Sequence, residues 1–377
     1  MRFETLAVHA GRAIDPATGA VATPIHLSST YARGPDGQGL HGFGYARYDN
    51  PNRHALEVAV AALEGGIGAM AYSSGSAVTT AVCRALGPGA LVLAPDDLFY
   101  GTRTLLLGTL KEWGLQSQFV DMSDLAALRA ALTAKPRLLW LETPSNPRLK
   151  ITDLGAASEL AHQAGALVVA DNTWATPTIQ TPIALGADVV IHSAVKYFGG
   201  HSDTSAGLAV VARDDGFSAK LREIQKYEGA VPSPFDCWLV HRGLHSLPAR
   251  MRQHCDTAAA VAGFLSRHPR VEAVHYPGLR SHPGHAIAAA QMKAGGGMVS
   301  FQVRGGRDEA IGVASRTALF IRAGSLGGVE SLIQHHATVE GPGSKTPQNL
   351  LRLSIGLEHP EDLINDLDHA LGRTDAA

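Results

Sequence analysis

Short apolar segments alternate with amphipathic segments through the first 230 residues of the chain. The apolar segments are rich in Val, Leu, Ile and Ala, which is typical of buried strands, and several segments between them repeat apolar residues at helical spacing. This alternation predicts an α/β fold with a mostly parallel sheet covered by helices on both faces. The expected strands are 68–72, 90–94, 138–141, 166–170, 188–191 and 207–211, and the expected helices are 54–64, 76–86, 124–134 and 153–164.

The pattern changes after about residue 229. A long helical connection, which includes an alanine-rich run at 256–267, leads to three further apolar runs. We interpret the runs at 297–303, 318–322 and 350–355 as strands of a second, smaller α/β unit. The first fifty residues are rich in Gly, Pro, Ser and Thr, so this arm lies across another part of the protein or another subunit. The expected organisation is an extended N-terminal arm, a large domain and a smaller C-terminal domain at residues 1–50, 51–235 and 236–377.

Composition and charge place the chain among globular proteins that act on small molecules. Of its 377 residues, 45% are hydrophobic and 18% are charged, and the formal net charge is -2. This balance provides no electrostatic footprint for nucleic acid or anionic lipid. No apolar run approaches the roughly 18 residues that a membrane span needs, and the N-terminal segment lacks the apolar stretch of a signal peptide. We therefore expect a cytoplasmic protein without a nucleic-acid or membrane partner.

Cysteine and histidine show no metal-site pattern. Cys83, Cys237 and Cys255 are far apart, so neither a disulfide framework nor a zinc site is expected. The 18 histidines are mostly scattered, and the adjacent His335 and His336 do not point the same way on a helix or a strand. The sequence therefore predicts no metal site.

Polar residues follow several of the expected strands, at the edge of a parallel sheet where ligands bind. Lys196 follows the run at 188–191. A buried ammonium is costly, so this lysine either extends to solvent or has a shifted pKa and forms a Schiff base, most often with pyridoxal phosphate. Asp171 could cap a turn, bind a metal or pair with a protonated ring nitrogen. The YSSGS segment at 72–76 could be a helix cap or a phosphate site. Together, the three features favour pyridoxal phosphate.

Further motifs extend along almost the whole chain. They are TGAVATPIHLSSTY (18–31), YARYDNPN (45–52), YSSGSAV (72–78), DDLFYGT (96–102), ETPSNP (142–147), DNTWATP (171–177), HSAVKYFGGHSD (192–203), SLGGVESLI (325–333) and LRLSIGLE (351–358). In this order they resemble the cystathionine γ-synthase, γ-lyase and β-lyase family of Cys/Met metabolism. The resemblance implies fold type I of the pyridoxal-phosphate-dependent enzymes, with a large domain, a smaller C-terminal α/β domain and pyridoxal 5'-phosphate as cofactor.

The resemblance also implies roles for individual residues around the cofactor. Lys196 matches the Schiff-base lysine, Asp171 the partner of the pyridine nitrogen, and Tyr100 the tyrosine that stacks on the ring and assists proton transfer. The matching phosphate ligands are the amides of Gly75 and Ser76 and the hydroxyl of Ser193.

The remaining matched residues concern the substrate and the subunit interface. Arg352, with Asn146 and the Ser325 region, matches the site that holds the substrate carboxylate, a role that suits an arginine within an apolar run. Tyr45 and Arg47 match a pair that reaches the phosphate from the neighbouring subunit. The resemblance therefore implies a homotetramer built as a dimer of dimers.

Several positions depart from the family pattern. Val195 replaces a threonine near the phosphate site, which removes one hydroxyl contact. Gly44 and Gly324 stand where many γ-synthases and γ-lyases carry acidic residues that face the distal end of the substrate. Thr102 replaces the cysteine of methionine γ-lyases, and Leu326 replaces the tryptophan of many bacterial β-lyases. No subfamily matches at every position.

We expect a carbon-sulfur lyase of transsulfuration that acts on a sulfur amino acid and is most similar to cystathionine γ-lyase. The alternatives are cystathionine γ-synthase, which joins an O-acylhomoserine to cysteine, cystathionine β-lyase and methionine γ-lyase. A homologue that binds a ligand without turnover is disfavoured because the matched lysine, aspartate, tyrosine and arginine are all present.

Overall fold

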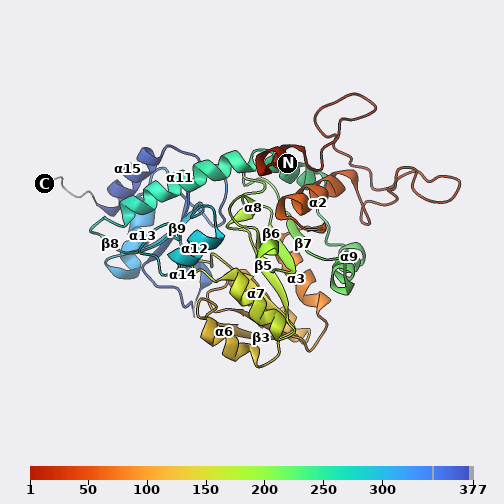
Figure 1. The fold of residues 1–377 in the computed structure, drawn as a ribbon. Helices are drawn as coiled ribbons and strands as arrows, with labels where there is room; N and C mark the ends of the chain where they lie inside the picture. The colour runs from red at the N-terminus through yellow and green to blue at the C-terminus, as the bar shows by residue number, and fades with distance from the viewer. Residues whose placement is uncertain (342–343, 373–377) are drawn as a thin grey trace.

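Two β-sheets organise the computed structural model, which describes residues 1–341 and 344–372 (Figure 1). The larger sheet has seven strands in the order β1-β7-β6-β5-β4-β2-β3, and the smaller has five in the order β10-β11-β12-β9-β8. The long helix α11 (Leu247–Leu265) packs against α1 and α10 at one end and against β8, β9 and α15 at the other. Figure 1 shows this helix running along both halves of the molecule.

The seven-stranded sheet confirms the predicted mostly parallel arrangement. Strands β2 to β6 are parallel to one another, whereas β7 is antiparallel to both β1 and β6. The apolar runs predicted as strands in the first 230 residues all form strands. Strand β3 was not predicted, because it lies at the edge of the sheet, is partly exposed and has the largely polar sequence QSQFV. The strands are β1 (Gly68–Tyr72), β2 (Leu91–Pro95), β3 (Gln116–Val120), β4 (Leu138–Glu142), β5 (Leu167–Asp171), β6 (Val189–Ser193) and β7 (Gly207–Val211).

Helices cover this sheet, and polar side chains cap several of them at the N-terminus. The side chain of Asn50 accepts hydrogen bonds from two backbone N–H groups, and Pro51 follows it, so α2 begins three residues before the predicted start. The helices are α1 (Phe3–His9), α2 (Pro51–Glu64), α3 (Gly75–Ala85), α4 (Tyr100–Leu107), α5 (Thr109–Glu112), α6 (Leu125–Leu132), α7 (Leu154–Gln163), α8 (Thr176–Ile179), η1 (Pro182–Leu185), α9 (Gly216–Glu228) and α10 (Pro234–Leu244).

The five-stranded sheet differs from the prediction at 318–322, where only Ile321–Arg322 is a strand. The Asp366 carboxylate accepts hydrogen bonds from the N–H groups of residues 318 to 320, so these groups do not join the sheet. Strands β8 and β11 are short and were missed. The elements are β8 (Val271–His275), α12 (His285–Gln291), β9 (Met298–Val303), α13 (Gly306–Arg316), β10 (Ile321–Arg322), β11 (Leu332–His335), α14 (His336–Glu340), β12 (Leu350–Ser354) and α15 (Pro360–Leu371).

The N-terminal arm begins with helix α1 and is irregular over residues 12–48, which contain two isolated β-bridges. Parts of this segment project from the rest of the molecule (Figure 1). Ile25, Leu27 and Leu40 are exposed on it. The predicted domain boundaries and the predicted contact of the arm with another subunit stay predictions.

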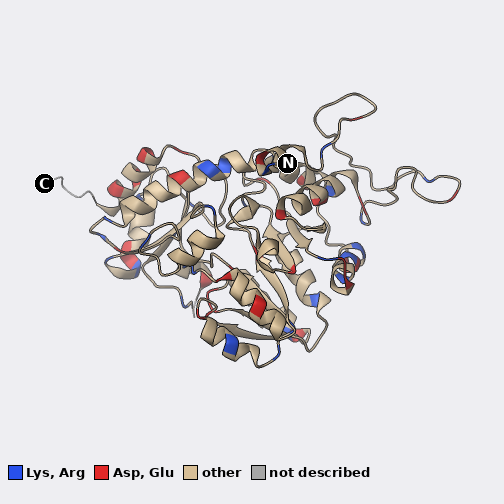
Figure 2. Cartoon of the chain, viewed as in Figure 1, with Lys and Arg blue, Asp and Glu red and all other residues tan. Residues whose placement is uncertain are grey.

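Charged residues of both signs are distributed over the two halves of the molecule (Figure 2). This mixture accompanies the nearly balanced net charge of -2. Among the helices in residues 1–341 and 344–372, none combines the length and apolar character needed to cross a bilayer. The same residues contain no cluster of His, Cys, Asp and Glu arranged to hold a metal ion.

Candidate active site

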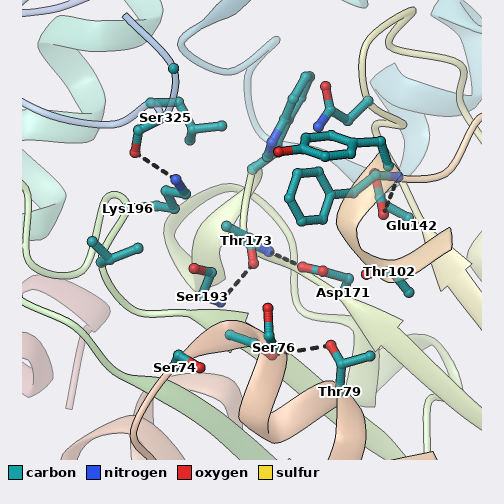
Figure 3. A pocket seen from close by; sticks show the side chains of 18 of the residues that line it. Ser74, Ser76, Thr79, Thr102, Glu142, Asp171, Thr173, Ser193, Lys196 and Ser325 are labelled. Carbon is teal, nitrogen blue, oxygen red and sulfur yellow. Dashed lines mark hydrogen bonds between the residues drawn. The ribbon is translucent and has the colours of Figure 1, made fainter. Parts of the chain in front are cut away.

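A cavity of about 390 Å³ lies at the carboxyl ends of the central strands, as the rule for parallel sheets predicts. The ends of β4, β5 and β6 and the start of α3 form one wall. Residues near β11 and β12 of the smaller sheet form the facing wall. Figure 3 shows Lys196 next to Ser325, with Ser193 and Asp171 further along the site. The site is therefore built from chain segments that are far apart in the sequence.

Lys196 extends into this cavity from the turn that follows β6. Its Nζ donates a hydrogen bond to Ser325 Oγ at 2.5 Å (Figure 3). Burial and, to a smaller extent, the positive charge of Arg352 together lower the pKa of the Lys196 amine to about 8. A substantial fraction of the amine is therefore neutral near physiological pH, and a neutral amine can attack a carbonyl.

Asp171 and Glu142 end the adjacent strands β5 and β4 at paired positions, and both line the cavity. The backbone N–H of Thr173 donates to Asp171 Oδ1 at 3.0 Å, so an Asx-type turn is present. Burial raises the pKa of Asp171, while the hydrogen bonds from Thr173 and the charge of His192 oppose that rise. Burial, and then the charge of Asp171, raises the pKa of Glu142 well above its usual range. One wall of the cavity thus holds a pair of carboxyl groups with different surroundings.

The start of α3 forms a cradle beside the end of β6. Ser74 caps the helix, because its Oγ accepts a hydrogen bond from the N–H of Ala77 at 3.1 Å. A Cβ added to Gly75 would lie 2.9 Å from both Cβ and Oγ of Ser193, so the space above the helix terminus requires glycine. Backbone N–H groups at a helix N-terminus, a nearby hydroxyl and the helix dipole are a suitable site for a phosphate.

Tyr100 is the first residue of α4, and its side chain lines the cavity. Its ring lies edge-on to Phe99, with centroids 5.1 Å apart, and edge-on to His336, with centroids 6.5 Å apart. The tyrosine therefore lies between the two walls, where it can cover a planar ligand.

Arg352 is central in β12 and is buried at the cavity wall. Its Nη1 donates to Asn146 Oδ1 at 3.0 Å, and its Nη2 donates to the Ser325 carbonyl at 3.1 Å and to Gln334 Oε1 at 2.6 Å. Burial lowers the pKa of its guanidinium to about 10. Within residues 1–341 and 344–372 it forms no ion pair with a carboxylate. A cation held in this way can bind a carboxylate of a ligand.

A model of the Cys/Met metabolism PLP-dependent enzyme family matches residues 4–372. The chain belongs to this family. Its curated relatives include a cystathionine γ-synthase of Mycobacterium tuberculosis, 49% identical over 98% of this chain and 96% of the relative. A cystathionine β-lyase of Coxiella burnetii is 45% identical over 98% and 97%, respectively. A cystathionine γ-lyase of Dictyostelium discoideum is 43% identical over 99% and 98%.

Solved structures of the family share the fold. The metB structure from Corynebacterium glutamicum superposes with a TM-score of 0.96 and 42% identity, covering 98% of each chain. A cystathionine γ-synthase from Xanthomonas oryzae in complex with cystathionine gives a TM-score of 0.94 and 40% identity, again covering 98% of each. The protein is therefore a PLP-dependent transsulfuration enzyme of fold type I, as the sequence predicted.

The residues of the cavity fit pyridoxal 5'-phosphate. The Gly75 cradle leaves room for a phosphate at the start of α3, because any larger residue would collide with Ser193. The amides of Gly75 and Ser76 and the hydroxyl of Ser193 would hold that group. Asp171 would hold a proton at the ring nitrogen, and Lys196 would bond to the aldehyde. Bound in this way, the cofactor supplies an electron sink for the reacting amino acid.

Two predicted cofactor ligands do not line this cavity. Tyr45 and Arg47 lie on the N-terminal arm, where the Arg47 guanidinium contacts the Tyr45 and Tyr48 rings at 5.6 and 4.8 Å from their centroids. Arg47 Nη1 also donates to the Lys226 carbonyl at 2.6 Å. Their predicted role at the site of a neighbouring subunit stays a prediction. Gly44, next to Tyr45, also lies outside the cavity.

The other departures from the family pattern line the cavity. Val195 precedes Lys196 in the chain, and Thr102 follows Tyr100 by two residues on α4. Leu326 and Gly324 belong to the wall near the smaller sheet. Differences at these positions therefore change the shape and hydrogen-bonding capacity of the site itself.

Several residues of the cavity were not predicted from the sequence, among them Glu142, Trp174, Gln334 and His336. Glu142 stands at the end of the predicted strand LLWL, and an acid at that position is the signal that could have identified it. Trp174 follows Asp171 in DNTWATP. Gln334 and His336 lie in and after β11, a strand that was not predicted. Without that strand, nothing in the sequence placed these two residues opposite Arg352.

Proposed function

We propose that this enzyme acts at the γ-carbon of an amino acid and that its main reaction is γ-replacement, in which cysteine displaces the acyl group of an O-acylhomoserine. The cavity wall made by the smaller sheet supports this proposal. Its lining residues are Gly324, Ser325, Leu326, Gln334, His336, Val339 and Arg352, and none of them is acidic. The O-acylhomoserine that begins γ-replacement carries an acyl group, which needs no carboxylate partner at this wall, whereas cystathionine entering as a substrate for cleavage carries a distal ammonium that would lack one.

The side chains of the cavity can serve this reaction in defined roles. Arg352 and Asn146 hold the substrate carboxylate and so orient the bonds of Cα. Lys196 Nζ accepts the Cα proton and, after releasing it, a Cβ proton, whose bonding pair forms a Cβ–Cγ double bond as the acyl group leaves Cγ with its own pair. The cysteine sulfur then adds to Cγ as its thiol loses a proton, and Nζ can return protons to Cβ and Cα. Ser325 Oγ accepts a hydrogen bond from Lys196 Nζ and so holds the amine toward the residues that bind the substrate carboxylate. Tyr100 covers the opposite wall and excludes water from the reacting atoms.

Cystathionine γ-lyase activity is the second candidate and the sequence-based expectation. The same γ-carbon step begins both reactions, and water then completes the release of a keto acid. The relative from Dictyostelium discoideum that is named a γ-lyase supports this alternative. The identity to the γ-synthase of Mycobacterium tuberculosis is higher, at 49% against 43%. A homotetrameric assembly and a cytoplasmic location stay predictions.

Product analysis separates the two reactions. Purified holoenzyme is incubated with O-acetylhomoserine or O-succinylhomoserine plus cysteine, and separately with L-cystathionine. We expect cystathionine to form from an acylhomoserine faster than L-cystathionine is broken down. Faster release of cysteine and 2-oxobutyrate from L-cystathionine would favour the γ-lyase, and release of homocysteine and pyruvate would favour a β-lyase. No product from any of these substrates would contradict the proposed function.

A further inference from the structure

Gln334 occupies a central place in the cavity wall. It lies on β11 directly opposite Arg352 on β12, in antiparallel register. Its Oε1 accepts a hydrogen bond from Arg352 Nη2 at 2.6 Å and lies 3.3 Å from His336 Nδ1. Arginine has no acceptor, so the amide oxygen must face it. We assign a hydrogen to the imidazole Nδ1, where it donates to the same oxygen, while Nε2 faces Glu340 Oε1 at 3.4 Å.

The orientation of the oxygen determines where the amide nitrogen points. A Cβ added to Gly324 would lie 3.3 Å from Gln334 Nε2, so this NH₂ group faces the space left by the missing side chain. Within residues 1–341 and 344–372, no acceptor bonds to Nε2. Both Gly324 and Gln334 line the cavity. The result is a fixed amide donor directed at the part of the ligand that lies beyond the carboxylate site.

We propose that Gln334 is a substrate-binding residue that selects the group at the far end of the amino-acid side chain. Its NH₂ group donates to a carbonyl, ester or carboxylate oxygen and opposes an ammonium, which has no acceptor to offer. The Arg352 cation lines the same cavity and opposes an ammonium as well. The preferred substrate class is an amino acid whose γ-substituent carries oxygen acceptors, which rests on the proposed γ-carbon chemistry.

His336 acts as a positioning residue for this amide. Its ring is buried, its Nδ1 donates to Gln334 Oε1, and its Nε2 lies 3.4 Å from Glu340 Oε1 one turn along α14. A neutral ring with hydrogen on Nδ1 and a protonated ring both provide the same donor to Gln334. Loss of that donor would leave the amide held by Arg352 alone and free to rotate.

Binding of two inert amino acids tests the selection without turnover. L-2-aminoadipate and L-lysine share the α-amino and α-carboxylate groups but end in a carboxylate and an ammonium, respectively. Their dissociation constants for the holoenzyme are measured from the change in cofactor absorbance. We expect wild type to prefer L-2-aminoadipate, and Gln334→Glu to shift the ratio of the two constants toward L-lysine by at least about tenfold, because the donor becomes a carboxylate. A loss of affinity at the α-carboxylate site that is common to both ligands cancels in the ratio of the two dissociation constants.

Further variants distinguish a change in ligand preference from a general loss of ligand binding. Gly324→Ala should shift the ratio in the same direction as Gln334→Glu, because its Cβ crowds the amide nitrogen. His336→Leu should shift it partly, and His336→Asn, which keeps a donor, should restore it. Gln253→Glu, an exposed residue of α11, adds the same charge away from the cavity and should leave it unchanged. A shift below tenfold in Gln334→Glu would overturn the proposal. Failure of the γ-replacement assay would instead count against the proposed function, since these constants need no turnover.

Discussion

Arg352 lies near Lys196 in the cavity, and its charge adds to the effect of burial in lowering the pKa of the lysine amine from 10.5 to about 8. The residues that we propose to bind the substrate carboxylate and the cofactor are therefore electrostatically coupled. The pH dependence of cofactor capture should report this coupling. Only the neutral amine attacks the aldehyde, and a lowered pKa makes that form dominant at a lower pH.

The rate at which apoenzyme recombines with PLP should thus rise with pH and reach half of its maximum near pH 8. Cofactor absorbance after rapid mixing measures this rate. Arg352→Met should move the midpoint to higher pH, because the repelling charge is gone, and Arg270→Met on the exposed surface should leave it in place. A wild-type midpoint near the ordinary lysine value of 10.5 would contradict this account.

Gly75→Ala should weaken cofactor binding with little effect on the fold. Its Cβ would stand 2.9 Å from two Ser193 atoms and would displace the Ser193 hydroxyl from the phosphate site. Loss of one hydrogen bond to a charged group, about 1.5–3 kcal/mol, corresponds to a rise of roughly tenfold to a hundredfold in the PLP dissociation constant. Gly216→Ala at the start of α9 is the matched control, because nothing lies within 4 Å of the added Cβ. Equal dissociation constants for the two variants would show that the cradle does not hold the phosphate.

Arg352→Met should raise KM for the amino-acid substrate. Hydrogen bonds to charged groups contribute about 1.5–3 kcal/mol, so the expected increase is roughly tenfold to a hundredfold. Arg352→Lys should restore binding only in part, because an ammonium cannot reproduce the planar fork of donors. Steady-state kinetics at saturating PLP measures the effect, with Arg270→Met as the control. An unchanged KM in Arg352→Met would place the substrate carboxylate elsewhere.

Mixing two inactive variants tests the predicted contribution of Arg47 to a neighbouring site. If Arg47 serves the partner subunit, a hybrid of Lys196→Ala and Arg47→Ala subunits contains one site with both changes and one site with neither. Random reassociation after mild denaturation should then recover about a quarter of the wild-type activity. The separate variants, treated in the same way, are the controls. No recovery in the mixture would indicate that Arg47 acts within its own subunit or not at all.

Much of the fold could be predicted because buried strands of a parallel sheet are apolar on both faces. This signal identified β4, β5 and β6 and so located Asp171 and Lys196 at strand ends. Strand β3 gave no such signal, because it is polar and lies at the sheet edge. The run at 318–322 looked like a strand, but Asp366 takes up three of its N–H groups.

The site residues could be predicted where they follow a predicted strand or belong to a motif of the family. Lys196, Asp171 and Arg352 belong to such motifs, and all three line the cavity. The position of Gln334 depends instead on the pairing of β11 with β12, which joins segments with no shared periodicity. Likewise, the apposition of Glu142 and Asp171 depends on strand order and register, which periodicity does not encode.

The central claim is that Lys196 forms the covalent bond with pyridoxal phosphate. Borohydride reduction of the holoenzyme, followed by proteolysis and mass spectrometry of the peptides, tests it most directly. We predict a single pyridoxyl group on the peptide that contains Lys196, and no adduct in Lys196→Ala. A pyridoxyl group on a different lysine of the wild-type protein, or none at all, would contradict the account.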